Sequence, residues 1–285
     1  MQIPLYNIFG DNYILQLATE AENAKMTPNY VEIEDKELKE ILGMAAEIAE
    51  YREKTQKFSI PLYKNDKESW KSALSCYSFP ETSSLSQIFR DFDFSKVKKC
   101  GEVTAPSFIK PEYYEYGRFP GRVDKEKIKV EPHYVILAAA GWVLTRIGKA
   151  NIGNAYVGVN VFSPQGGILY SLIKKLGGAQ LPGVKPETAF SLWISKKVSE
   201  LSVTSITASF LRVYIITDAA GNKPTVINSG FTVEVSKILN KRELLTDKLE
   251  KITEKALDVN YDMRDYYIKL VNYIYEYING SKRIE

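Results

Sequence analysis

The segment Pro132-His133-Tyr134-Val135-Ile136-Leu137-Ala138-Ala139-Ala140-Gly141-Trp142-Val143-Leu144-Thr145-Arg146-Ile147 contains the longest apolar run of the chain. The run extends from Tyr134 to Thr145 and is too short to cross a bilayer, which needs about 20 residues. Proline suits the first turn of a helix. We therefore predict a helix over residues 133–147 that is buried on most sides. Its small residues at 138–141 would let another backbone approach closely.

Glycines punctuate the chain after this helix, and β-rich stretches follow. Residues 155–162 indicate a short strand, and residues 168–176 and 187–199 indicate two short helices. Residues 203–217 are rich in Val, Ile, Thr, Phe and Tyr, which favours a strand. A turn at 218–224 and a second strand at 225–235 would complete a hairpin.

Before the apolar segment, the clearest pattern is an amphipathic helix at residues 36–57 with Asp35 as its N-cap. Its apolar stripe consists of Leu38, Ile41, Leu42, Ala45, Ile48 and Ala49, and Arg52 lies off this stripe. We also expect a turn at Phe9-Gly10-Asp11-Asn12, a short strand at 30–33 and a weaker helix at 66–77. Residues 78–131 have no clear period and several prolines, and such stretches are often functional or ordered by a partner.

The last 50 residues carry two helical stripes, with Gly280 as a plausible C-cap. Tyrosines widen the second stripe, which fits either packing between two antiparallel helices or a docking surface for another subunit. The sequence thus predicts an α+β protein: mixed N-terminal and central regions with a β-hairpin, followed by a C-terminal antiparallel helix pair. We divide it into an N-terminal region at 1–131, a central glycine-rich basic core at 132–235 and a helical pair at 236–285.

The composition is that of a globular protein, with 45% hydrophobic and 26% charged residues among 285. Two cysteines exclude a disulfide scaffold, and with the single histidine they make a Cys/His zinc site improbable. The N-terminal residues lack a basic region followed by an apolar run, so we expect a cytoplasmic protein with no membrane partner. Nineteen tyrosines and a richness in Lys, Glu and Ile, with few Cys and Met, point toward a thermophile, and AT-rich coding bias would give much the same composition.

The charge is unevenly distributed along the chain. Residues 101–230 hold 15 Lys/Arg against 9 Asp/Glu, and within them residues 132–230 hold nine cations against three carboxylates. Surplus surface cations attract polyanions, so the middle of the chain is a candidate nucleic-acid-binding region. The alternative is that acidic residues of the N-terminal part balance these cations in space.

The residue types that usually perform catalysis are scarce. Gly148-Lys149 is followed by Ala150 and so lacks the hydroxyl of a phosphate-binding loop. The carboxylates of the middle region are scattered, whereas a metal nuclease needs them clustered. His133, the only histidine, lies at the start of the predicted buried helix, and Cys76 and Cys100 have the character of packed or incidental thiols. We therefore predict no catalytic residue, no metal and no cofactor, while a metal-independent ribonuclease using His133 stays open.

Two segments have the composition of a nucleic-acid contact. Residues 113–122 interleave aromatics, glycines and arginines, whose guanidinium groups suit phosphates and base edges. Residues 146–154 combine donors with glycines that permit close backbone approach. The alternatives are a tyrosine-rich surface segment and a helix end followed by a turn. The candidate binding residues are Arg118, Arg122, Lys125, Lys127, Arg146, Lys149, Asn151, Asn154, Lys174 and Lys175, of which the last two equally suit a solvated helix end.

The opening Phe9-Gly10-Asp11, the glycine-rich centre from Gly141 to Gly183 and the Gly221-Asn222-Lys223-Pro224 turn resemble the archaeal CRISPR-associated large-subunit family. This family belongs to the type I subtype A crRNA-guided surveillance (Cascade) complex. The resemblance covers most of the chain as general organisation, and the chain is short for a large subunit.

This resemblance implies a non-catalytic subunit in antiviral defence that contributes to recognition of target DNA and its flanking motif. The implied partners are crRNA, target DNA, other subunits of the crRNA complex and a helicase–nuclease that performs cleavage. Two alternatives stay open: a metal-independent RNA-processing endoribonuclease, and a protein-interaction scaffold without direct nucleic-acid contact.

Overall fold

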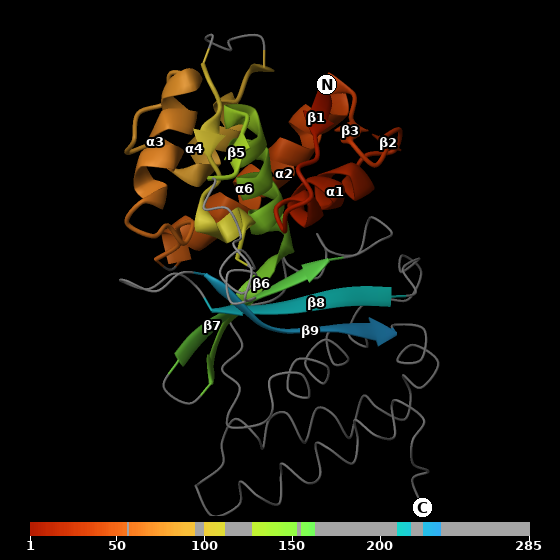
Figure 1. Cartoon of the computed structure of the whole chain (residues 1–285), viewed down its shortest axis with the longest axis vertical. Coiled ribbons are helices and arrows are strands. Elements are labelled where there is room, and N and C mark those ends of the chain that lie inside the picture. The colour runs from red at the N-terminus through yellow and green to blue at the C-terminus, as the bar shows by residue number, and fades with distance from the viewer. Residues whose placement is uncertain are drawn as a thin grey trace, which may run out of the picture. The chain divides into compact units, whose positions relative to one another are not determined.

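The computed structural model of the chain describes residues 1–55, 57–94, 100–111, 127–152, 155–162, 210–217 and 225–234 (Figure 1). The chain divides into two compact units. The first unit consists of Met1–Arg146 and Thr217–Ile227, and the second of Ile147–Ile216 and Asn228–Glu285.

The first unit is mainly helical, with two small antiparallel sheets. Its helices are α1 (Asp11–Glu20), α2 (Asp35–Thr55), α3 (Asp66–Cys76), α4 (Leu85–Asp91) and α6 (Pro132–Thr145), with a 3-10 turn η2 (Ser107–Ile109). Its strands are β1 (Gln2–Pro4), β2 (Lys25–Met26), β3 (Tyr30–Glu32), β4 (Val103–Thr104) and β5 (Lys129–Val130). The first sheet has the order β1-β3-β2 with Ile3 opposite Val31, and β4 pairs with β5 with Val103 opposite Val130.

Helix α6 is the core of the first unit. All of its residues other than His133 are buried, as its nearly continuous apolar sequence predicts. Helices α1, α2 and α3 pack against it, with α1 and α3 on different sides in Figure 1. The predicted buried helix is confirmed, although it ends at Thr145 and Arg146 begins a strand. The predicted close approach is also confirmed, because Gly141 lies directly against the Tyr13 backbone of α1.

Helix α2 confirms the predicted amphipathic helix. All six residues of the predicted apolar stripe are buried. The helix begins at Asp35 itself, and this residue's carboxylate contacts the N-terminal ammonium at 3.0 Å. Helix α3 and strand β3 confirm the weaker helix and the short strand predicted at 66–77 and 30–33. However, Arg52 lies on the buried side of α2, so its placement off the apolar stripe does not expose it.

Two helices occupy segments where the sequence pattern predicts only turns or irregular chain. Helix α1 begins at Asp11, inside the predicted Phe9–Asn12 turn, and the Asp11 carboxylate accepts hydrogen bonds from the amides of Tyr6 and Ile8, which precede the helix. Helix α4 lies within 78–131, where the Ser84 hydroxyl accepts a hydrogen bond from the Gln87 amide at 3.1 Å. The serine cluster is therefore an N-cap signal, and the stretch is not irregular throughout.

Cys76 and Cys100 are joined by a disulfide, so their assignment as packed or incidental thiols is wrong. Their Cα atoms are 5.9 Å apart, inside the usual range for a disulfide. Cys76 ends α3 and Cys100 precedes β4, so the bond connects a helix to the strand pair that follows it. Sequence spacing could not reveal this pairing, because the two cysteines are 24 positions apart and only the tertiary fold brings them together.

The remaining described residues form a four-stranded sheet with the order β6-β7-β8-β9. Its strands are β6 (Arg146–Ile152), β7 (Ala155–Phe162), β8 (Phe210–Thr217) and β9 (Val226–Glu234). Strand β7 has the bounds that the sequence predicts, and β8 and β9 lie within the two predicted hairpin strands. Strand β6 replaces the expected helix end and turn. In β8, Leu211, Val213 and Ile215 are buried in alternation with more exposed residues, as expected for a sheet with one covered face.

The helices and small sheets confirm the α+β class. The predicted helices at 168–176 and 187–199, the turn at 218–224 and the C-terminal helix pair lie outside the described residues. The division into regions 1–131, 132–235 and 236–285 stays a prediction. In the part of the chain that the structure describes, no helix is both long and apolar enough to span a membrane.

Candidate nucleic-acid interface

The first candidate segment is anchored to the helical unit at both ends. Residues 112–126, which include Arg118, Arg122 and Lys125, lie outside the described residues. The chain enters this segment after the η2 turn, at Lys110 and Pro111, and leaves it at Lys127 into β5. Strand β5 is fixed by its pairing with β4, where Lys129 lies opposite Thr104. The two ends of the arginine-bearing segment are therefore held by ordered structure.

Three lysines surround these two ends. Lys127 and Lys129 are exposed, and Lys110 is half-buried. Burial lowers the pKa of Lys110, and the positive charge of Lys127 lowers it further, which places the two ammonium groups within electrostatic range. The Asp66 carboxylate partly offsets this effect. That carboxylate also accepts hydrogen bonds from the Ser107 hydroxyl and from the Tyr63 amide.

In the second candidate segment, residues 146–154, the one candidate side chain that the structure describes is buried. Arg146 is only 2% exposed, and its guanidinium lies 5.2 Å from the centroid of the Trp142 ring. Lys149 and Asn151 belong to β6, but their side chains lie outside the description, as do Asn154, Lys174 and Lys175 altogether. Among the described candidates, only Lys127 is thus seen at the surface.

Sequence reasoning missed the buried Arg52, which lies close to Arg146. Its Nη2 donates a hydrogen bond of 2.5 Å to the Arg146 carbonyl oxygen at the end of α6, and its guanidinium lies 5.2 Å from the Phe58 ring. Burial, with a contribution from the Arg146 charge, lowers the pKa of Arg52 to about 10. Phe58 in turn stacks on Trp142 with centroids 5.3 Å apart. Because an arginine suits the C-terminal carbonyls of a helix, Arg52 joins α2 to the end of α6.

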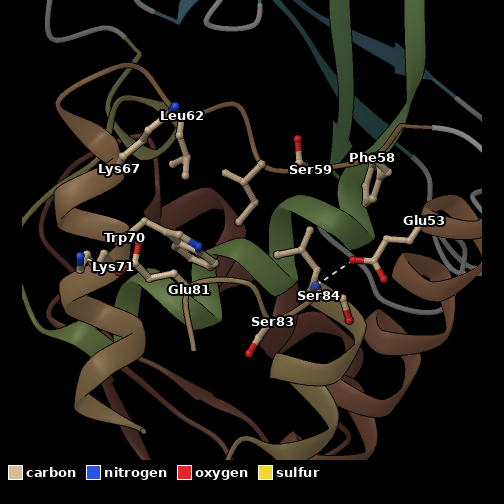
Figure 2. Close-up of a pocket in the computed structure, with 12 residues that line it drawn as sticks. Glu53, Phe58, Ser59, Leu62, Lys67, Trp70, Lys71, Glu81, Ser83 and Ser84 are labelled. Carbon is tan, nitrogen blue, oxygen red and sulfur yellow. Dashed lines mark hydrogen bonds and ion pairs between the residues drawn. The ribbon is translucent and has the colours of Figure 1, made fainter. Parts of the chain in front are cut away.

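A separate pocket of about 330 Å³ lies between the end of α2, α3 and the start of α4 (Figure 2). Its lining mixes aromatic, hydroxyl and charged side chains: Glu53, Phe58, Ser59, Ile60, Leu62, Lys67, Trp70, Lys71, Glu81, Ser83, Ser84 and Leu85. The Glu53 carboxylate accepts hydrogen bonds from the Leu85 amide at 2.8 Å and the Ser86 hydroxyl at 2.6 Å. This carboxylate therefore fixes the first turn of α4 against α2.

His133 has the structural position that the sequence favours. Its side chain is 15% exposed, and its Nε2 lies 3.0 Å from Glu131 Oε2 without the alignment of a hydrogen bond. Burial lowers the pKa of His133, and the nearby Glu131 carboxylate opposes this shift. In the described ranges, no three His, Cys, Asp or Glu side chains are grouped so that they could hold a metal ion.

The Phe9-Gly10-Asp11 stretch, which contributes to the family resemblance, serves the packing of α1 and α6. The Gly10 amide donates to the Ile109 carbonyl at 2.7 Å, and a Cβ at this position would lie 2.7 Å from the Tyr134 hydroxyl oxygen. That hydroxyl donates to Asp11 Oδ1 at 2.6 Å. These residues therefore have an architectural role, and the Gly221–Pro224 turn lies outside the described residues.

The fold and the candidate interface define an α+β protein in which described lysines flank the segment that bears Arg118 and Arg122. The profile of a known family, CRISPR-associated protein, CsaX, matches residues 31–285, and the chain belongs to this family. No curated protein matches the sequence.

Membership of this family indicates a role in CRISPR defence together with other CRISPR-associated subunits. It confirms the CRISPR association that the sequence resemblance implied. The subtype, the archaeal and thermophilic origin and the identity as a Cascade large subunit stay predictions.

Proposed function

We propose that the protein is a non-catalytic nucleic-acid-binding subunit of a crRNA-guided antiviral complex, where it contributes to recognition of target DNA and its flanking motif. Its partners would be crRNA, target DNA, the other subunits and a separate helicase–nuclease. One observation carries the proposal: Lys110, Lys127 and Lys129 surround the fixed ends of the segment that bears Arg118 and Arg122.

The electrostatics at the lysine-flanked ends of this segment favour an anionic partner. Burial disfavours the charged form of Lys110; the Asp66 carboxylate opposes this effect, and repulsion from the Lys127 charge adds to it. A phosphate placed near both ammonium groups would relieve that repulsion and release counterions from the nucleic acid. In this proposal the lysines position the sugar–phosphate backbone, while Arg118 and Arg122 read base edges.

The placement of His133 supports a binding role in preference to RNA cleavage. A general base must reach the proton that it removes, whereas this imidazole is largely buried beside Glu131. Cleavage of the target is accordingly assigned to a partner enzyme.

The test is the salt dependence of duplex binding by the full chain, alone and in the reconstituted complex. We expect the logarithm of affinity to fall with the logarithm of salt concentration by about 0.9 for each phosphate neutralised. The double variant Arg118→Ala/Arg122→Ala should lower that slope by about 2 if each arginine contacts one phosphate, or lower sequence preference if they contact bases. Lys39→Ala, which removes an exposed cation of α2, is the matched control and should change neither.

Salt-insensitive association, or no association in either setting, would refute the proposed function. An equal loss of affinity in the arginine variant and the Lys39 control would refute the assignment to this segment, because it would indicate a general charge effect.

A further inference from the structure

We propose that the pocket between α2, α3 and α4 receives a single unstacked base of a single-stranded nucleic acid, with Trp70 as its stacking platform. This inference rests on the proposed function, because it names a second contact for the same class of ligand. The pocket is separate from the segment at 112–126, and its lining comes entirely from described residues of the first unit.

Trp70 is the aromatic surface that is free to stack. It is half-buried on α3 and makes no ring contact with another described residue. Phe58 is different, because it is held by Trp142 and by the Arg52 guanidinium. Figure 2 shows Trp70 on one side of the pocket and Phe58 with Glu53 on the other. Phe58 therefore contributes a fixed wall, and Trp70 offers its ring to a planar ligand.

Hydroxyl and indole groups in the pocket supply hydrogen bonds for the edge of such a ligand. Ser59 Oγ and the Trp70 indole nitrogen make no hydrogen bond to a described residue. Both groups are therefore able to pair with the edge of a bound ring. A nucleobase carries both donors and acceptors on its edge.

The charges favour a neutral ring inside the pocket and a phosphate at its margin. Glu81 is paired with Lys71 at 2.5 Å, and both oxygens of Glu53 are occupied by the first turn of α4. Lys67 is exposed and makes no ion pair with a described residue, so its ammonium is available. The lining holds two carboxylates and two ammonium groups, so it carries no net formal charge and suits an uncharged base better than a phosphate inside it. Lys67 would bind the adjoining phosphate.

The size of the pocket selects an unstacked base. About 330 Å³ is at the small end of ligand pockets and suits one heterocycle with part of its sugar. A base within a duplex is covered on both faces and cannot enter, so the ligand is a single strand or a locally opened one.

The experiment compares binding of the full-length wild-type chain and its variants to a short single-stranded oligonucleotide by fluorescence anisotropy, with circular dichroism to confirm folding. Trp70→Ala should weaken binding about tenfold, because base–aromatic stacking accounts for affinity differences of that order. Trp70→Phe, which keeps a ring, should stay within about threefold of the wild type. Tyr51→Ala is the matched control, since it removes a 66% exposed aromatic residue from α2 and should change nothing.

An abasic scan adds a readout that a merely structural role of Trp70 would not change. One position of the oligonucleotide should lose affinity when its base is removed, and the Trp70→Ala variant should be insensitive to that removal. If Trp70→Ala does not fold, Lys67→Ala replaces it and should lower the salt slope by about 0.7 for a single strand.

The outcomes separate this inference from the proposed function. Normal binding by Trp70→Ala, or a salt slope unchanged by Lys67→Ala, would overturn the base pocket while the proposed function stands. Wild-type protein that binds neither single strands nor duplexes would overturn both.

Discussion

Gly141 of α6 and Tyr13 of α1 mark the closest approach of two helices in the first unit. A Cβ added at Gly141 would lie 2.8 Å from the Tyr13 Cβ and would also overlap the Tyr13 carbonyl group. Backbone atoms cannot move aside as the end of a side chain can, so the helices would have to separate. This contact holds α1 against the buried α6 and, through α1, positions the Asp11 carboxylate that binds the Tyr134 hydroxyl.

Gly141→Ala should therefore destabilise the protein by about 1–3 kcal/mol, the usual range for overpacking a core. Urea unfolding followed by circular dichroism measures the change. Gly43→Ala is the matched control, because α2 has nothing within 4 Å of a Cβ at that position. The control should stabilise α2 by about 0.5–1 kcal/mol through its better helix propensity. Equal effects of the two substitutions would contradict the close approach.

The alkaline limit of stability should depend on Tyr77. Burial, with a smaller contribution from the Glu131 carboxylate, raises the pKa of Tyr77 to about 12. Because the folded state keeps the phenol neutral, its contribution to stability is complete below pH 10 and is lost as the pH rises through 12. Tyr77→Phe has no ionisable group at this position, so the variant should resist alkaline unfolding better than the wild type.

Thermal melts at pH 8 and at pH 11–12 measure this difference. At pH 8 the two proteins should melt similarly, since the Tyr77 hydroxyl makes no hydrogen bond to a described residue. Burial also raises the pKa of Tyr134, but that group is present in both proteins and cancels in the comparison. An identical decline of both proteins above pH 10 would exclude Tyr77 as a source of the alkaline sensitivity.

The Cys76–Cys100 disulfide should contribute about 3 kcal/mol to the free energy of unfolding, from the loop entropy of a closure of this size. Cys100→Ser and treatment of the wild type with a phosphine reductant should lower the melting temperature by similar amounts. The double variant Cys76→Ser/Cys100→Ser should not respond to the reductant. A wild-type melt that the reductant leaves unchanged, with two thiols titrating in the folded protein, would argue against the bond.

The sequence predicted the elements whose pattern is local and strong. Residues 36–57 and 133–147 carry their own periodicity or continuous apolar character, and their burial follows directly. Helix α1 was missed because its first turn depends on Asp11, whose carboxylate must reach the amides of Tyr6 and Ile8. The cap at Ser84 was present in the sequence but was hidden by neighbouring serines with the same chemistry.

At the candidate sites, too, the sequence could not predict what depends on tertiary packing. Arg146 and Arg52 look like surface cations in the sequence, but the aromatic rings of Trp142 and Phe58 cover them in the fold. Likewise, the pocket at Trp70 has no sequence signature, because it forms where the ends of three helices meet. Charge counts locate a basic region, whereas only tertiary packing decides which of its cations remain available.

His133 provides the decisive test between binding and RNA cleavage. The imidazole is largely buried, and burial lowers its pKa while the Glu131 carboxylate opposes that change. We expect purified full-length protein to leave labelled RNA intact in EDTA over hours, and His133→Ala to behave identically. Because this largely buried side chain belongs to the first turn of α6, the same substitution should lower stability modestly, by about 1 kcal/mol. Metal-independent cleavage by the wild type that His133→Ala abolishes, in a variant that still folds, would replace the binding role with an endoribonuclease.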